Sequence, residues 1–307
     1  MTLNKKEEQI KNIINPIKAE MEVFEEKFKN AIFEEKNFLS GELYSYLSLG
    51  AKRLRVIFVF LFSKILNISK EKENDVFKIA LLCEILHNAT LLHDDILDDE
   101  EKRRGQVAFQ IKHGNKLSIL EGDFLLALAL KILSTLPKEI VEIFSKKILN
   151  TVKGEISQWD SKNVVLKIEN YYKKSFEKTG NIFLAGLESL FCLKEIDDFI
   201  KENLKKYLYN FSLAFQIKND IDDFSKNSSD YKNGNFTLPI IYFKEENKEE
   251  LGEIDIKKLE KYIKKANLKV EEINKNSLIY LKNIEEKIEN KNELKILKDL
   301  NNLLIEE

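Results

Sequence analysis

The stretch "IALLCEILHNATLLHDDILDD", residues 79–99, decides the fold. Its apolar side chains recur at the three- and four-residue spacing of an α-helix, and they leave so little polar surface that we expect the helix to be buried or to line a cleft. Asp94, Asp95, Asp98 and Asp99 end this apolar run. The stretch therefore predicts a core helix with a polar site at its carboxyl end.

The same helical spacing recurs along nearly the whole chain, and strand alternation is almost absent. With only 3 Pro and 10 Gly in 307 residues, the chain has too few helix breakers for a many-stranded fold. No long linker or internal repeat divides it, so we expect one all-α domain spanning 1–307. The expected helices cover about 5–36, 53–67, 72–99, 115–135, 138–160, 167–192, 196–225 and 255–290.

Bulk charge excludes several classes of partner. A net charge of −2 with 33% charged residues indicates a two-signed surface without the basic excess that nucleic acid or anionic lipid attracts. The first residues lack the apolar segment of a signal peptide, and no window reaches the roughly 18 apolar residues of a membrane span. We therefore expect a cytoplasmic protein without a transmembrane segment.

The acidic residues are spaced for metal binding. On a helix Asp94 and Asp98 lie one above the other, with Asp95 about 100° round the axis. Like charges at this spacing destabilise a helix unless a cation lies between them. Magnesium suits the position because it is commonly held by one or two carboxylates, with water and substrate phosphate oxygens as its other ligands.

A second acidic cluster follows another apolar helix in "FQIKNDIDDF", residues 215–224. It contains Asp220, Asp222 and Asp223. Between the two clusters, Lys178 and Thr179 interrupt the apolar helix "FEKTGNIFLAG". Two acidic clusters with a polar interruption between them predict a site that binds a diphosphate through magnesium and favours its departure.

Arginine is confined to two short segments. Among 50 basic residues only four are Arg, and they lie in "GAKRLR" and "KRRG", as Arg53, Arg55, Arg103 and Arg104. A chain that uses Lys almost everywhere is expected to place Arg where a planar, bidentate grip on phosphate oxygens is needed. Two such segments predict two diphosphate groups.

Seven motifs in order resemble those of the all-trans polyprenyl diphosphate synthases, which elongate isoprenoid chains head to tail. They are GAKRLR (50–55), LLHDDILDDEEKRRG (91–105), EGDFLLALA (121–129), GEISQ (154–158), KTG (178–180), FQIKNDIDD (215–223) and GNFTLP (234–239). The resemblance implies a single bundle of long helices around a central cavity, a homodimer, Mg²⁺ as cofactor, and condensation of isopentenyl diphosphate with an allylic diphosphate.

The resemblance also implies residue roles. The magnesium ligands would be Asp94, Asp95 (in support), Asp98, Asn219, Asp220 and Asp223. The substrate-binding residues would be Lys52, Arg53, Arg55, His87, Arg103 and Arg104, with Arg103 on the allylic diphosphate and Lys52, Arg55, His87 and Arg104 on isopentenyl diphosphate. Lys178, Thr179 and Gln216 would line the reacting centre. His93 lies off the face that His87 shares with Asp94, and we expect it to be structural.

The helix before Asp94 bears on product length. In the family the growing tail is expected to run beside this helix, so the side chains four, five, eight and eleven residues earlier would limit it. These are Thr90, Ala89, Leu86 and Cys83. The two nearest the diphosphate are small, which predicts products of twenty carbons or more.

Three departures from the family pattern lie in the second acidic motif and the loop after it, and the first of them bears on the choice between functions. Asn219 stands where the second motif begins with Asp, and Asn235 replaces a Lys, so that Lys226 and Lys232 become the candidate phosphate-binding lysines of a short loop. The alternatives are a non-catalytic or regulatory prenyl-diphosphate-binding subunit, a class I terpene cyclase and a di-iron bundle. The last needs two Glu-x-x-His pairs, and the sequence supplies one, Glu84 and His87.

Overall fold

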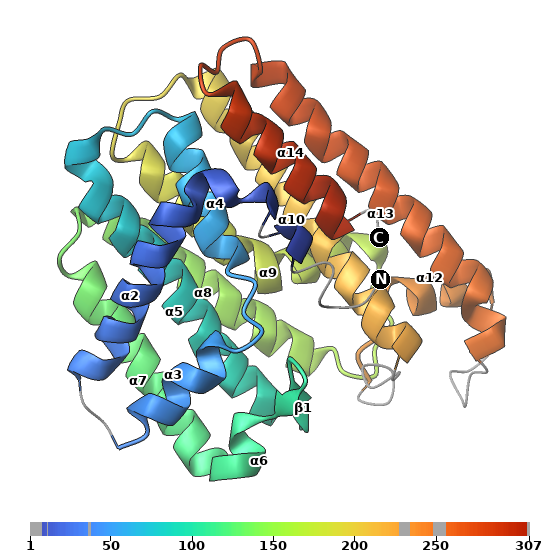
Figure 1. Ribbon diagram of the computed structural model, residues 1–307. Coiled ribbons are helices and arrows are strands. Elements are labelled where there is room, and N and C mark those ends of the chain that lie inside the picture. The colour runs from blue at the N-terminus through green and yellow to red at the C-terminus, as the bar shows by residue number, and fades with distance from the viewer. Residues whose placement is uncertain (1–7, 11, 36–37, 227–233, 248–255, 306–307) are drawn as a thin grey trace. The chain divides into compact units, whose positions relative to one another are not determined.

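The computed structural model describes residues 8–10, 12–35, 38–226, 234–247 and 256–305, and these residues are almost entirely helical (Figure 1). The predicted all-α fold is confirmed. The helices, in chain order, are the 3-10 turn η1 (Asn15–Ile17), α2 (Lys18–Glu34), α3 (Ser40–Ser48), α4 (Leu54–Ile65), the 3-10 turn η2 (Lys70–Lys72), α5 (Glu73–Leu97), α6 (Phe109–His113), α7 (Asn115–Leu133), α8 (Lys138–Asp160), α9 (Ile168–Phe191), α10 (Asp198–Lys226), α12 (Leu238–Glu246), α13 (Ile256–Ile284) and α14 (Lys291–Ile305). A short antiparallel ribbon, β1 (Lys102–Arg103) with β2 (Gln106–Val107), lies between α5 and α6 in sequence.

Most helix bounds agree with the sequence prediction to within a few residues. The helix expected over 5–36 is interrupted, because Pro16 in the 3-10 turn η1 has no backbone N–H for a helical hydrogen bond, and α2 begins only at Lys18. The sequence analysis missed α3, α6, α12 and α14, which have 9, 5, 9 and 15 residues. Short helices give few repeats of the apolar period and are therefore the hardest to recognise.

The chain divides into two compact units. The first runs to Phe144 and also includes Ala185–Glu195; the second consists of Ser145–Leu184 and Ile196–Glu307. Each unit thus combines segments that are far apart in sequence. The single domain expected over 1–307 stays a prediction.

Helix α5 is the core of the first unit and packs against α4 and α7. Both α4 and α5 are apolar on nearly every face, and α4 buries the continuous run from Val56 to Phe62. Gly122 of α7 lies against His93 of α5, where an added Cβ would come within 2.2 Å of the imidazole Nε2. The Nε2 atom is also 3.3 Å from the Ile119 carbonyl oxygen. His93 is therefore in the packed contact between α5 and α7.

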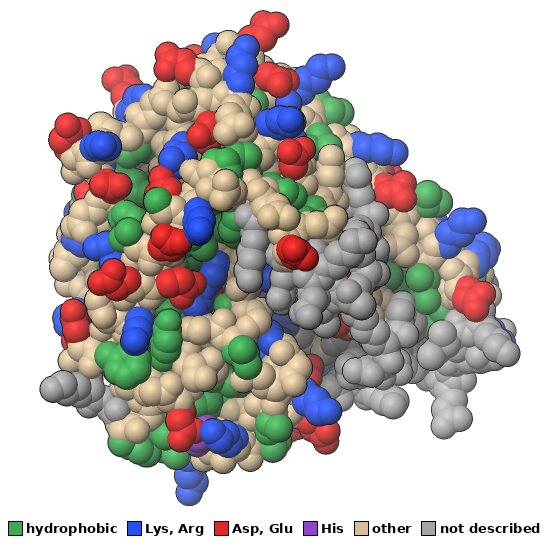
Figure 2. All heavy atoms as spheres, in the orientation of Figure 1, with side chains coloured by type: hydrophobic (Ala, Val, Ile, Leu, Met, Phe, Trp, Pro, Cys, Tyr) green, Lys and Arg blue, Asp and Glu red, His purple; other side chains and the backbone are tan. Residues whose placement is uncertain are grey.

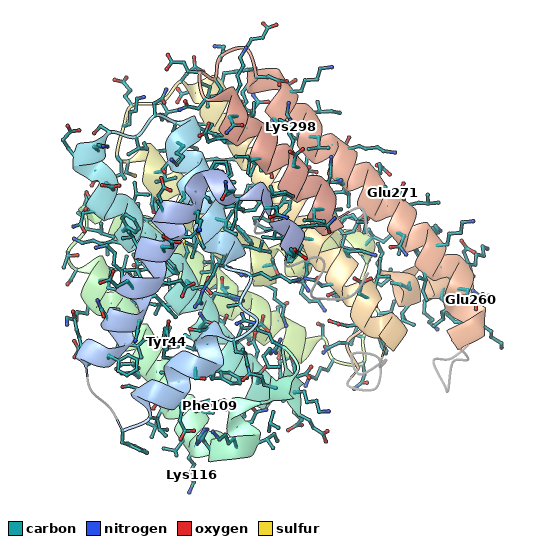
Figure 3. The ribbon with its side chains drawn as sticks, in the orientation of Figure 1. Tyr44, Phe109, Lys116, Glu260, Glu271 and Lys298 are labelled. Atoms are coloured by element: carbon teal, nitrogen blue, oxygen red, sulfur yellow. The ribbon has the colours of Figure 1, made fainter. Side chains whose placement is uncertain are left out.

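The second unit is built around α10 and α13, with α12 and α14 also packed on α13. Leu259, Ile263, Val270 and Ile273 recur at helical spacing along α13; all but the partly exposed Ile263 are buried. Glu260 and Glu271 on the same helix are exposed (Figure 3). The heavy charge of this segment is therefore its solvated face.

Charged side chains of both signs are scattered over the visible surface (Figure 2), as the composition predicts. Within the described residues, the stretch Lys70–Leu97 is the one helix long and apolar enough to cross a membrane by length and composition. Most of that stretch is buried inside the protein, as in the core helix of a globular domain.

Candidate active site

Two carboxylates lie on one partly exposed face at the end of α5. Asp94 is in the last turn of the helix and Asp98 is its C-cap residue. Both side chains are partly exposed, whereas Asp95 between them is completely buried. The i, i+4 spacing therefore places Asp94 and Asp98 where an ion or a substrate can reach them.

Asp95 joins the end of α5 to two other segments. Its Oδ2 accepts a hydrogen bond from the Tyr46 hydroxyl of α3 at 2.9 Å, and its Oδ1 accepts from Nε of Arg103 at 2.7 Å and from Nη2 of the same guanidinium. Burial and the Asp95 charge raise the pKa of Tyr46, so its hydroxyl stays a donor. Phe109 of α6 packs on the Tyr46 ring, with centroids 5.3 Å apart. Asp95 therefore holds the Arg103 guanidinium at the end of α5 that also carries Asp94 and Asp98.

The remaining predicted basic residues of this unit form a positively charged cluster. Burial lowers the pKa of Arg55 to about 10, and the charge of Arg104 adds to this effect. The pKa of Arg104 is lowered by burial and by Arg53 and Arg103. His87 has a pKa well below its usual value because of burial and the charges of these arginines, so its imidazole is neutral at pH 7. Neighbouring positive charges thus lower the pKa values of Arg55, His87 and Arg104, and such a basic cluster favours the binding of an anion.

The turn before α4 gives this cluster its shape. Gly50 has φ +65°, and an added Cβ there would come within 3.2 Å of the Arg104 Cβ. Nη1 of Arg104 donates to the Leu47 carbonyl at 3.3 Å. Glycine at position 50 therefore permits the segment containing Lys52 to approach the segment containing Arg104.

Arg53 is buried, and its guanidinium contacts two carboxylates. Its Nε and Nη2 donate to the two oxygens of Glu25 at 2.8 and 3.1 Å, and Nη1 donates to Glu84 at 2.8 Å. The pairing of Glu84 with Arg53 also removes the acid of the Glu-x-x-His pair that a di-iron bundle would need.

In the second unit, the predicted residues of α9 and α10 form a hydrogen-bonded chain. The Thr179 hydroxyl donates to Oε1 of Gln216, and Nε2 of Gln216 donates to Oδ1 of Asp220 at 2.6 Å. The Tyr171 hydroxyl donates to the other oxygen, Oδ2, at 2.7 Å. Burial nevertheless raises the pKa of Asp220. Nζ of Lys178 lies 3.8 Å from Oε1 of Glu155, which belongs to the GEISQ motif.

Sequence reasoning did not find Tyr171. Its signal is the spacing: it precedes Lys178 by seven residues, two helical turns, and so lies on the same face of α9. Burial also raises its pKa well above the usual value, which keeps the hydroxyl protonated as a donor. The sequence contains the two tyrosines "NYYKK", but nothing local indicates which of them contacts an acid 49 residues away.

The rest of the second acidic cluster is more accessible. Asn219 is partly exposed and Asp223 is exposed. Asp222 forms an i, i+4 ion pair with Lys218 at 3.1 Å. Lys232 and the side chain of Lys226 lie outside the described residues. Among the residues that are described, no group of three or more Asp, Glu, His or Cys side chains lies close enough together to hold a metal ion.

A profile of the polyprenyl synthetase family matches residues 37–279. The chain belongs to the polyprenyl synthetase family. This match includes all seven motifs, and it covers the described site residues of both units.

Individual polyprenyl synthetase relatives agree with this assignment. A prenyl transferase of Cyanophora paradoxa is 33% identical over 255 residues, which are 78% of this chain and 77% of that protein. A decaprenyl-diphosphate synthase of Dictyostelium discoideum is 34% identical over 210 residues, 66% of this chain and 45% of that protein. The structure of a geranylgeranyl pyrophosphate synthetase from Geoglobus acetivorans superposes with a TM-score of 0.80 at 27% identity, covering 97% of this chain and 99% of that one.

Proposed function

We propose that this polyprenyl synthetase condenses isopentenyl diphosphate with an allylic diphosphate and releases a product of twenty carbons or more. The observation that carries the proposal is that one unit combines Asp94 and Asp98, on an accessible helix face, with a basic cluster of Arg55, His87 and Arg104, whose pKa values are lowered by burial and by neighbouring arginines. Carboxylates suit a divalent metal, and the clustered cations suit the phosphates.

The reaction balances with the groups that the substrates supply. The bond between the allylic C1 and the diphosphate oxygen breaks, and its electron pair leaves with the diphosphate. The double bond of isopentenyl diphosphate attacks C1, which forms the new carbon–carbon bond and a tertiary cation. That cation loses a proton to the departed diphosphate, and the new double bond forms.

The residues present fit a divalent metal, which we propose to be Mg²⁺. Asp94 and Asp98 supply hard oxygen ligands one helical turn apart, and Asp95 supports them by holding Arg103. From the second cluster we propose Asn219, Asp220 and Asp223 as ligands, with both Asp220 oxygens fixed by Tyr171 and Gln216. When bound, the metal supplies Lewis-acid stabilisation of the leaving diphosphate.

The basic residues divide between the two substrates. We assign the allylic diphosphate to Arg103, whose guanidinium is held by Asp95 beside the acidic helix end. We assign isopentenyl diphosphate to Lys52, Arg55, His87 and Arg104. His87 binds as a neutral imidazole, since its pKa lies well below 7, and so donates a hydrogen bond without titrating near neutrality.

Dipoles of the second unit are proposed to stabilise the allylic cation. The Gln216 carbonyl and the Thr179 hydroxyl are fixed by the hydrogen bond between them, so they need little reorganisation when charge develops. Lys178 is held near Glu155 and would bind the departing diphosphate. Fixed dipoles of this kind are more effective than water, which must reorient around the new charge.

The α5 side chains favour a product of twenty carbons or more. Thr90 lies one turn before Asp94 and is partly exposed on the same face, with its hydroxyl hydrogen-bonded to the His87 carbonyl at 2.8 Å. Ala89 beside it is small and buried. Neither side chain is an aromatic that would stop the tail within the first turn. Leu86, a turn further back, is the first bulky residue at these positions.

We also propose that the protein is a homodimer. Leu120, Ala127 and Leu130 are exposed on one face of α7, and Leu149, Val152, Ile156 and Trp159 on one face of α8. Apolar stripes of this kind are typical of protein interfaces. Size-exclusion chromatography with light scattering tests the proposal: Leu130→Asp or Ile156→Asp should shift the dimer toward monomer, whereas Leu268→Asp, at an exposed position of α13, should not. A monomeric wild type would contradict it.

The purified protein alone, with Mg²⁺, labelled isopentenyl diphosphate and allylic primers, tests the activity. Condensation that stops in the presence of a chelator and falls by about 10² to 10³ in Asp94→Ala is expected, because one preorganised electrostatic element is lost. Activity unchanged by the chelator would contradict the metal assignment. Prenyl-diphosphate binding without condensation would favour the alternative of a regulatory subunit, which the substitution by Asn219 keeps open. The cytoplasmic location stays a prediction.

A further inference from the structure

Every N–H group of the Arg53 guanidinium is used within the protein. Besides the bonds from Nε, Nη1 and Nη2 to Glu25 and Glu84, Nη1 donates to the Leu47 carbonyl and Nη2 to the Ser48 hydroxyl, both at 3.3 Å. A guanidinium has five N–H donors, and these are five hydrogen bonds. No donor remains for a phosphate oxygen.

These bonds join four helices of the first unit. Glu25 belongs to α2, Leu47 and Ser48 to the end of α3, Glu84 to α5, and Arg53 is itself the N-cap residue of α4. The Phe28 and Phe24 rings lie 4.5 and 5.8 Å from its guanidinium carbon. Phe28 also contacts the ring of Tyr44 on α3, which Figure 3 labels. Arg53 is therefore surrounded by the elements whose packing it fixes.

The backbone at Arg53 supports the same interpretation. Its φ of +50° lies in the left-handed region, which is unfavourable for a residue with a Cβ. Gly50, three residues earlier, is also left-handed. Lys52 lies between these two positions and Arg55 lies just after them, and both are assigned to isopentenyl diphosphate. The left-handed conformation at Arg53 is strained, so other contacts must stabilise the turn. The five hydrogen bonds of the Arg53 guanidinium supply such contacts.

We propose that Arg53 is a positioning residue, which fixes the turn 50–55 through Glu25 and Glu84 so that Lys52 and Arg55 face isopentenyl diphosphate. This inference rests on the proposed function. It separates Arg53 from the other three arginines, with which the sequence analysis grouped it as a substrate-binding residue. The local charge agrees with it, because two carboxylates around one guanidinium make a net negative group that would repel a diphosphate.

The test compares two carboxylates of α2 that each pair with a cation at or on α4. Glu25→Ala removes two of the five Arg53 bonds, whereas Glu20→Ala removes the Glu20–Lys64 pair, which has an N–O distance of 2.7 Å and similar partial exposure. Glu25→Ala is expected to raise KM for isopentenyl diphosphate about 10-fold or more, because small displacements of binding groups have effects of this size. KM for the allylic substrate should change little. Glu20→Ala should leave both KM values unchanged.

Arg53→Met completes the test as a double-mutant cycle. If Arg53 acts through Glu25, the Arg53→Met/Glu25→Ala variant should have a KM no higher than Arg53→Met alone, since both changes disrupt one contact. If Arg53 bound the diphosphate itself, Glu25→Ala would leave KM unchanged or lower it, because a competing anion is gone. That result overturns the proposal. Should Arg53→Met fail to fold, the Glu25→Ala and Glu20→Ala pair decides the question alone.

Calorimetric titration with inorganic diphosphate separates this inference from the proposed function. A wild type that binds diphosphate without catalysing condensation would contradict the proposed function only. The positioning role then predicts weaker diphosphate binding in Glu25→Ala than in Glu20→Ala. Equal affinity in these two variants would overturn the inference even if the wild type is active.

Discussion

Replacing Asp95 with Asn should destabilise the protein, whereas the same change at Asp94 should not. Asp95 is completely buried and accepts bonds from Tyr46 and from two nitrogens of Arg103. The amide is nearly isosteric but carries no charge. It therefore leaves the mostly buried Arg103 guanidinium without its counter-ion and presents an N–H group where one of the bonds needs an acceptor.

The magnitude follows from the burial of the pair. Loss of one partner of a buried ion pair costs about 3 to 5 kcal/mol. The lower end of this range applies because 31% of the Arg103 side chain is exposed to solvent. About 3 kcal/mol corresponds to a fall of roughly 6 to 12 °C in Tm for a cooperative unit of this size. Partly exposed Asp94 has no comparable burial to lose, so Asp94→Asn should melt close to the wild type.

Thermal unfolding followed by circular dichroism measures the stability of each variant. Condensation assays over a range of Mg²⁺ concentrations measure its activity. Asp95→Asn should have a lower Tm, with activity reduced because Arg103 is no longer held. Asp94→Asn should keep the wild-type Tm and still lose activity, as a metal ligand would. The reasoning is refuted if Asp95→Asn melts within about 2 °C of the wild type, since the buried pair would then contribute almost nothing to stability.

Three further predictions concern metal affinity, product length and pH. Asn219→Asp should lower the Mg²⁺ concentration for half-maximal rate, because a carboxylate binds a hard cation better than an amide does; an unchanged Mg²⁺ titration would mean that position 219 does not reach the ion. Thr90→Phe should shorten the products, seen by chromatography of labelled products, because the ring blocks the helix face one turn of about 5.4 Å from Asp94; an unchanged distribution would show that the tail does not pass this face. Bonds from Lys261 and Lys265 lower the pKa of Glu246 to about 2. Because this pKa is depressed in the folded state, its contribution to stability is present above about pH 4.5 and is lost as the pH falls toward 2, so the Tm difference between wild type and Glu246→Gln should vanish over that interval.

The sequence determined the helical class and the order of the main helices. Apolar spacing is a local property, and a 25-residue helix such as α5 repeats it enough times to be recognised. The i, i+4 relation of Asp94 and Asp98 is local in the same way, so their common face at a helix end could be predicted. The ordered motifs were sufficient to name the family.

Tertiary structure alone decided which charged side chains are buried against a distant partner and which stay accessible. Arg53 looks like Arg55 in sequence, but its partners Glu25 and Glu84 lie 28 and 31 residues away. Asp95 meets Tyr46, and Tyr171 meets Asp220, each across 49 residues. Such pairs depend on how helices pack, and helical periodicity carries no information about which residue of a distant helix will be opposite. The role of a charged side chain is therefore set by its burial and its long-range partner, and neither can be read from its neighbours in the chain.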